Sequence, residues 1–197
     1  MTVRSGGVFI HNGTSGSCLT ITSATLQFNS GGKLTLQRLD GNIPTSAWDT
    51  GSICEVAYGG TGDGAKQATS ALVQNFADFT VNCPLNVTGW DFAGQLTNHV
   101  GNFSVTTGPN PGATELKLFS GGLGNLNIGG NFNINSGSVN IGSSGGPWSI
   151  TLTSNLTVAA GADLNISGSA TPPPAEPGAQ FSNAFADKLN SQSRRSL

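Results

Sequence analysis

The stretch Gly124 to Ser169 reads GNLNIGGNFNINSGSVNIGSSGGPWSITLTSNLTVAAGADLNISGS. Pairs of apolar residues separated by one polar residue alternate with short runs of Gly, Ser and Asn. A period of two predicts β-strands with one buried face, and the small residues between them favour turns. Strands this short cannot enclose a core singly, so they are expected to stack. The apolar pairs are Leu126/Ile128, Phe132/Ile134, Val139/Ile141, Ile150/Leu152, Leu156/Val158 and Leu164/Ile166.

A repeat period separates a solenoid from a sheet built of hairpins. One series of leading apolar positions is spaced by 24, 29 and 24 residues, a second by 23 and 25, and a third by 24. A coil of three short strands and three turns needs about this many residues. The three series are Phe79, Phe103, Phe132 and Leu156; Leu116, Val139 and Leu164; and Leu126 and Ile150.

These intervals predict an all-β fold, a parallel three-sided β-helix in which each coil pairs with the next at about 4.8 Å. We expect it to be right-handed, because parallel crossovers almost always are. A β-sandwich would also contain many short strands, but it does not account for the recurrence of one motif.

The predicted β-helix domain covers residues 1–169, with an irregular part at 40–78 and regular coils at 79–169. Within the irregular part, Trp48 is expected to cover an apolar edge from a longer turn, and 65–76 could form a short helix. Residues 170–197 read as a Pro-rich linker and tail. That tail is compatible with a short amphipathic helix or with disorder.

Composition excludes several classes of protein. Only 9% of the 197 residues are charged, the net charge is -2, and there are 29 glycines. The few Lys and Arg form no basic stripe, which argues against a nucleic-acid partner. No apolar run is long enough to predict membrane insertion. The N-terminus lacks the apolar region of a signal peptide, so an export signal is expected outside this sequence.

Asn102, Asn131 and Asn155 take the same place in successive coils. Stacked amides at such a place can hydrogen-bond along a ladder and satisfy the backbone of the turns. The alternative is that Asn merely tolerates the turn conformation.

Cys54 and Cys83 are 29 residues apart, the interval that separates Phe103 from Phe132. This spacing predicts that they face inward as in-register neighbours of adjacent coils. A disulfide and a stacked pair of buried thiols are both compatible with it. The histidines and cysteines show no metal-site spacing, and no cofactor is expected.

An enzyme acting on acidic polysaccharides would need a carboxylate cluster with a basic partner. The regular coils from 101 to 169 contain only Glu115, Lys117 and Asp163 as charged residues, so we expect no catalysis. Asp78 and Asp91 could approach one another across coils, but no basic residue has a matching position. Trp90 and Trp148 are the best candidates for stacking on a glycan, although edge packing or the covering of a turn explains each more simply.

Outward Thr pairs at Thr20/Thr22 and Thr151/Thr153 are the feature that an ice-binding solenoid would use. Two unaligned pairs give it little support.

Four segments resemble repetitive secreted surface proteins of Bacteroidota, which are adhesin-like β-solenoids. They are NIPTSAWDTGSICEV at 42–56, FTVNCP at 79–84, GQLTNHVGNFSV at 94–105 and GGNFNI at 129–134. The resemblance implies a secreted or cell-surface location and a structural or adhesive role. The C-terminal sorting domain frequent in such proteins is not visible in this sequence.

We therefore expect a non-catalytic extracellular structural or adhesive β-solenoid that contacts glycans or cell surfaces and can associate end to end with itself. The alternatives are a carbohydrate-binding or polysaccharide-degrading β-helix and, third, an ice-binding protein.

Overall fold

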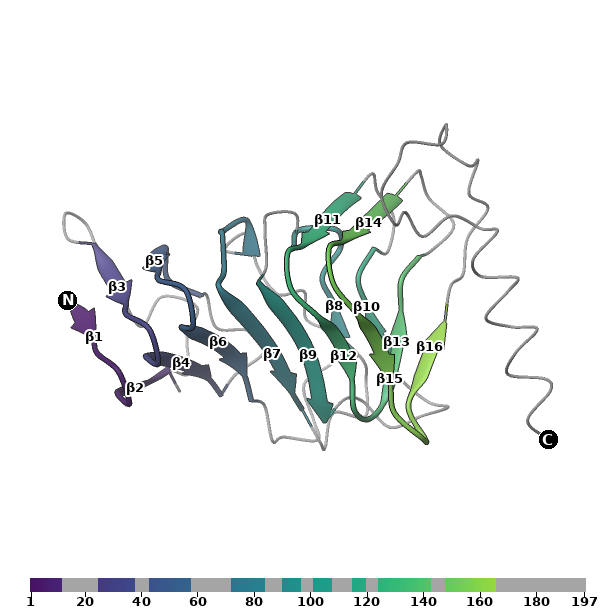
Figure 1. Ribbon diagram of the computed structural model, residues 1–197, viewed down its shortest axis with the longest axis horizontal. Helices are drawn as coiled ribbons and strands as arrows, with labels where there is room; N and C mark the ends of the chain where they lie inside the picture. Colours follow the sequence, from purple (N-terminus) through teal and green to yellow (C-terminus); the bar gives the residue numbers. More distant parts are fainter. Residues whose placement is uncertain are drawn as a thin grey trace.

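Parallel strands stacked along one axis make up the fold (Figure 1). The computed structural model describes residues 1–11, 25–37, 43–57, 72–83, 90–96, 101–107, 115–119, 124–142 and 148–165. Every strand pair in these ranges is parallel, and they contain no α-helix. The chain is therefore an all-β solenoid, as its repeat period predicts. Its handedness and number of faces stay predictions.

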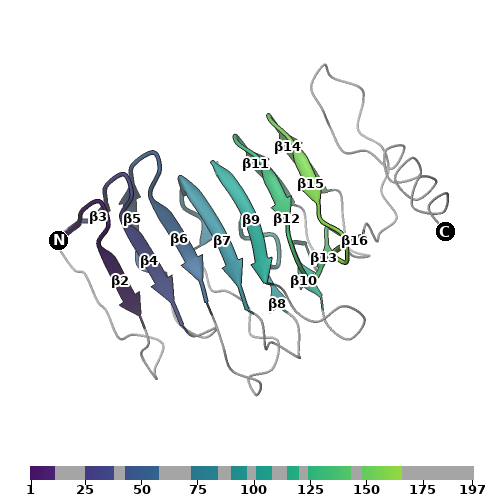
Figure 2. The same ribbon diagram turned by 60° about the horizontal axis from the view of Figure 1, so that its bottom comes forward.

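A seven-stranded sheet runs the length of the stack, in the order β15-β12-β9-β7-β6-β4-β2 (Figure 2). Each strand contributes alternate residues to the interior, as expected for a sheet with one buried face. This sheet, called the long sheet below, connects the first described coil to the last. Its strands are β2 (Val8–His11), β4 (Lys33–Leu36), β6 (Ile53–Val56), β7 (Asp78–Asn82), β9 (Asn102–Thr107), β12 (Phe132–Ile134) and β15 (Leu156–Val158).

Three smaller sheets supply the other strands of the coils. One has the order β1-β3-β5, one β16-β13-β10-β8, and one pairs β11 with β14. In the later coils one strand from each of three sheets follows in turn, since β11–β12–β13 pair one by one with β14–β15–β16. Their bounds are β1 (Thr2–Val3), β3 (Leu26–Phe28), β5 (Ser46–Trp48), β8 (Trp90–Asp91), β10 (Leu116–Lys117), β11 (Gly124–Ile128), β13 (Ser138–Asn140), β14 (Trp148–Leu152) and β16 (Asp163–Asn165).

The register that the repeat period predicts is confirmed. Phe103 pairs with Phe79 on one side and Phe132 on the other, and Phe132 pairs with Leu156. Val139 lies between Leu116 and Leu164, and Leu126 pairs with Ile150.

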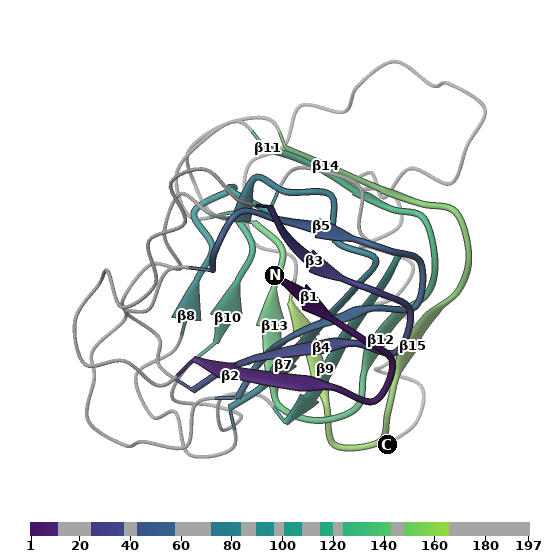
Figure 3. The same ribbon diagram turned by 90° about the vertical axis from the view of Figure 1, so that its left-hand side faces the viewer.

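The sheets surround a common interior (Figure 3), and several aromatic rings belong to the buried core there. Phe103 stacks on Phe132 with centroids 5.0 Å apart, and Phe79 meets Phe76 at 5.0 Å. Trp48 extends this column by stacking on Phe28 at 4.5 Å. Such contacts stabilise the core beyond the area that they bury, so one column of rings runs through successive coils.

Within 40–78, the described residues 43–57 are more regular than expected. Trp48 does pack against the core, but it does so from strand β5, which pairs with β3. Extended backbone is favoured there because the Trp48 ring can then lie flat on Phe28. Leu72 is in a 3₁₀ turn, and residues 73–76 are not helical; the Gln74 N–H donates to Leu72 O and the Phe76 N–H to Gln74 O.

The Gln74 side chain explains that departure from helical structure. Its Oε1 accepts hydrogen bonds from the Ser46 N–H at 3.0 Å and from Trp48 Nε1 at 3.2 Å. The segment thus supplies polar partners to β5. Residues 65–71, the tail at 170–197 and the Thr20/Thr22 pair lie outside the described residues. Among the described residues there is no helix long and apolar enough to cross a membrane.

Candidate functional site

The asparagines at the corner before the long sheet form one hydrogen-bonded row. The Asn131 N–H donates to Asn102 Oδ1 at 2.9 Å, and the Asn155 N–H donates to Asn131 Oδ1 at 3.2 Å. Each amide oxygen therefore binds the backbone one coil further on. Asp78 occupies the preceding place, where its Oδ1 accepts from the Asn102 N–H at 2.9 Å and from Asn102 Nδ2 at 2.7 Å. We call Asp78, Asn102, Asn131 and Asn155 the corner row.

Glycine precedes two members of the corner row for a steric reason. A Cβ on Gly101 would collide with the carbonyl of Ala77, and one on Gly130 would collide with the Gly101 carbonyl and Asn102 Oδ1. The coils can approach closely enough for these hydrogen bonds only without a side chain there.

A cleft of about 440 Å³ lies along this corner. The corner glycines Gly101 and Gly130 line it together with Asp78, Asn102 and Trp48. Trp48 is of little use as a stacking platform, because its ring stacks on Phe28 and also contacts Phe76 at 5.2 Å. The cleft offers a ligand both apolar and polar groups.

The outer face of the long sheet carries a second row of polar side chains. On each of the six strands from β4 to β15, one polar residue that faces outward lies in register with its counterpart on the neighbouring strand. Such in-register residues are spaced by about 4.8 Å, the distance between neighbouring strands. We call this the outer row: Thr35, Glu55, Thr80, Ser104, Asn133 and Thr157.

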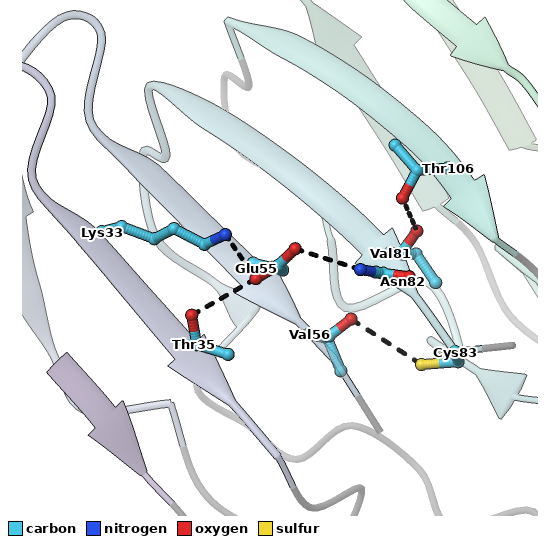
Figure 4. A network of polar contacts seen from close by, with 8 residues as sticks. All are labelled: Lys33, Thr35, Glu55, Val56, Val81, Asn82, Cys83 and Thr106. Atoms are coloured by element: carbon cyan, nitrogen blue, oxygen red, sulfur yellow. Dashed lines mark hydrogen bonds and ion pairs between the residues drawn. The ribbon is translucent and has the colours of Figure 1, made fainter. Parts of the chain in front are cut away.

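Glu55 is the only charged member of the outer row, and its neighbours neutralise it (Figure 4). Lys33 Nζ lies 2.6 Å from Glu55 Oε2, Thr35 Oγ1 donates to the same oxygen at 3.2 Å, and Asn82 Nδ2 donates to Oε1 at 3.3 Å. Only 12% of the Glu55 side chain is exposed. The Glu55 carboxylate is thus held by one ammonium group and two neutral donors.

The in-register pairing predicted for Cys54 and Cys83 is wrong. Cys54 pairs with Phe79, which is four residues before Cys83. Both side chains are described and buried, and no disulfide joins them. Cys83 Sγ instead donates to Val56 O at 3.7 Å. The interval of 29 residues misled because the coil between β6 and β7 has a different length from the coil between β9 and β12.

The two tryptophans proposed as glycan contacts lie on strands of two different sheets. Trp90 lies in β8 and pairs with Leu116. Trp148 lies in β14, and its half-buried ring stacks on Phe119 at 6.0 Å. Thr151 is exposed, and its neighbour on the next strand is Asn127 rather than another threonine. Thr151 therefore does not continue a row of threonines.

The acidic residues also lie apart. Asp78 is in the long sheet and Asp91 is in β8 of another sheet, where its Oδ1 accepts from the Ala93 N–H at 2.7 Å. Glu115 accepts from Asn140 Nδ2 at 2.7 Å and from Asn165 Nδ2 at 2.9 Å. In the ranges that the structure describes, no three His, Cys, Asp or Glu side chains gather as a metal site.

Sequence reasoning missed that Asp78 begins the corner row and that Glu115 bridges two asparagines. The first had a signal, because Asp78 stands before Phe79 as Asn102 stands before Phe103. The second had none, since Glu115 lies 50 residues from Asn165. No family model, curated protein or solved structure matches the chain.

Proposed function

We propose that the chain is a non-catalytic structural and adhesive β-solenoid segment of a secreted or cell-surface protein. The observation that carries this proposal is the outer row, a line of polar side chains on neighbouring strands of the long sheet, in which Thr80, Ser104, Asn133 and Thr157 are at least partly exposed. The aromatic column beneath and the corner row beside it support a stiff scaffold that holds these side chains in place.

The ligand chemistry that fits the outer row is a neutral glycan. Hydroxyl and amide groups of Thr80, Ser104, Asn133 and Thr157 can donate to and accept from sugar hydroxyls. Each such hydrogen bond is weak in water, but a chain of sugars lying across several strands makes many of them at once. The one carboxylate is neutralised by Lys33, so no strong charge preference is expected.

The absence of catalysis is part of the proposal. Glu55, Asp78 and Glu115 each accept hydrogen bonds from neighbouring side chains. These carboxylates therefore stabilise coils, which supports a structural role for them.

A glycan array probed with the folded chain tests the proposal. We expect binding to a class of neutral glycans, and we expect Ser104→Lys with Asn133→Lys to abolish it, because both substitutions place long charged side chains on the outer row. Thr151→Lys is the matched control, since Thr151 is exposed on β14 outside the long sheet. Equal binding by the two variants, or no binding by the unmodified chain, would contradict the adhesive role.

A further inference from the structure

In the part of the chain that the structure describes, both edges of the long sheet are open. β2 is the first strand in its order and β15 the last, so each has a described strand on one side only. Open edges of flat sheets expose unpaired backbone groups that can pair with another chain. Exposed apolar side chains gather at the same places. Of the five large apolar side chains exposed in the described ranges, Val8 (56%) and Ile10 (57%) belong to β2 and Val158 (39%) to β15.

The backbone of β2 shows which groups are available. Gly7 O and His11 O accept from the N–H groups of Lys33 and Gln37 in the next coil. In a parallel ladder alternate residues bond to the same neighbour, so the N–H and C=O groups of Val8 and Ile10 point away from β4.

At the other edge the same parity holds. Asn155 O accepts from the Phe132 N–H, and the Ala159 N–H donates to Ile134 O. The N–H and C=O groups of Leu156 and Val158 therefore point away from β12. The free backbone groups of Leu156 and Val158 on β15 therefore match those of Val8 and Ile10 on β2 in a parallel strand pairing.

The interior rows fit as well. Phe9 and Leu156 are the two ends of one in-register row, and His11 and Val158 are the two ends of another. Val158 faces the interior side yet is 39% exposed, because no described strand covers it. A second β2 placed beside β15 would continue both rows and cover Val158.

We propose that the open edge at β15 of one copy of this chain pairs with the open edge at β2 of a second copy. The contact is head-to-tail, with parallel strands and Leu156 next to Phe9. A heterologous contact of this kind leaves a free edge at each end, so it produces open chains rather than closed dimers. The proposal does not depend on glycan binding.

Two proline substitutions test it. Ile10→Pro removes a backbone N–H that points away from β4 at the β2 edge. Val158→Pro removes a backbone N–H that points away from β12 at the β15 edge. Neither N–H is used inside the fold, and proline is tolerated on edge strands in this orientation. Sedimentation velocity over a range of concentrations is the measurement.

The unmodified chain should form species larger than a dimer as its concentration rises, and each variant alone should stay monomeric. An equimolar mixture should form a dimer and nothing larger, because one variant keeps its β15 edge and the other its β2 edge. An unmodified chain that stays monomeric overturns the proposal, and so does a mixture that grows beyond the dimer. Association of Val158→Pro alone would show a symmetric contact between β2 edges and would overturn the head-to-tail arrangement.

If a proline variant does not fold, Val158→Asp tests the same contact. Its charge would be partly solvated in the single chain but buried in the contact, so association should again be lost. Val73→Asp is the matched control, since Val73 is 54% exposed and lies at neither edge. Loss of association in both aspartate variants would contradict the assigned surface.

Discussion

Removing one amide from the middle of the corner row should destabilise the solenoid, and Asn102→Ala is the sharpest such change. Alanine loses the hydrogen bond from Nδ2 to Asp78 and the acceptor for the Asn131 N–H, at 2.7 and 2.9 Å. A hydrogen bond to a charged group contributes about 1.5–3 kcal/mol and a neutral one about 1 kcal/mol. Both groups are half-buried, so water replaces part of this loss. We expect the free energy of unfolding to fall by about 2–4 kcal/mol.

The control lies in the same row. Asn155→Ala changes the same residue type at an exposed position whose side chain makes no hydrogen bond to any described residue, so its effect should stay below about 0.5 kcal/mol. Urea denaturation measures both variants, with unchanged slopes as the condition for comparison. Hydrogen exchange adds a local measurement, since the Asn131 amide should lose protection in Asn102→Ala. Equal stability of the two variants, with the Asn131 amide still protected, would refute the structural role of the corner row.

Three further changes test other parts of the interior. Gly130→Ala should destabilise the fold more than Gly161→Ala, because a Cβ at Gly161 meets no atom within 4 Å. The positive φ of 79° at Gly161 adds some strain to that variant. Thermal unfolding compares the two, and an equal loss of stability in both would contradict the steric argument. His11→Leu should raise the free energy of unfolding by about 1 kcal/mol, because both ring nitrogens of this buried residue lack partners among the described residues and unsatisfied buried groups are costly. His11→Gln keeps polar atoms there and should give no gain. Burial raises the pKa of the Cys54 thiol well above its ordinary value, and the Glu55 carboxylate adds to the shift. The unfolded thiol ionises first, so the contribution of Cys54 to stability should be complete below about pH 8.5 and should fall as the pH rises above it. Cys54→Ala should flatten that part of the pH profile, and thiol-directed reagents should label native Cys54 only after unfolding; rapid native labelling would contradict its burial.

The sequence predicts the register of the later coils well, because Phe79, Phe103, Phe132 and Leu156 lie in register on neighbouring strands of the same sheet. Side-chain periodicity and glycine-rich turns are local properties, and stacking follows from them. The pairing of Cys54 failed for the opposite reason. Coil length varies where a turn contains extra residues, and a spacing borrowed from one pair of coils does not transfer to another.

The polar contacts were harder to predict. Asn102 and Asn131 could be placed in one row from their spacing, but the partners of Glu55 come from two other strands of the long sheet, β4 and β7. The open edges at β2 and β15 could be predicted only if the first and last strands of the sheet were known. Periodicity alone indicates those strands only approximately. The strand β5 was missed because Pro44 and Trp48 suggest a turn, whereas the aromatic contact with Phe28 favours extended backbone.

The corner row also bears on how such a chain can change in evolution. Each member binds only the coil directly beside it, and the Gly-Asn signature before β9 recurs before β12. A duplication of one whole coil would therefore give the new copy the same hydrogen bonds on both sides, while an insertion of part of a coil would break them. Unequal recombination between these repeats can thus lengthen or shorten the protein in steps of one coil, with each intermediate still able to fold.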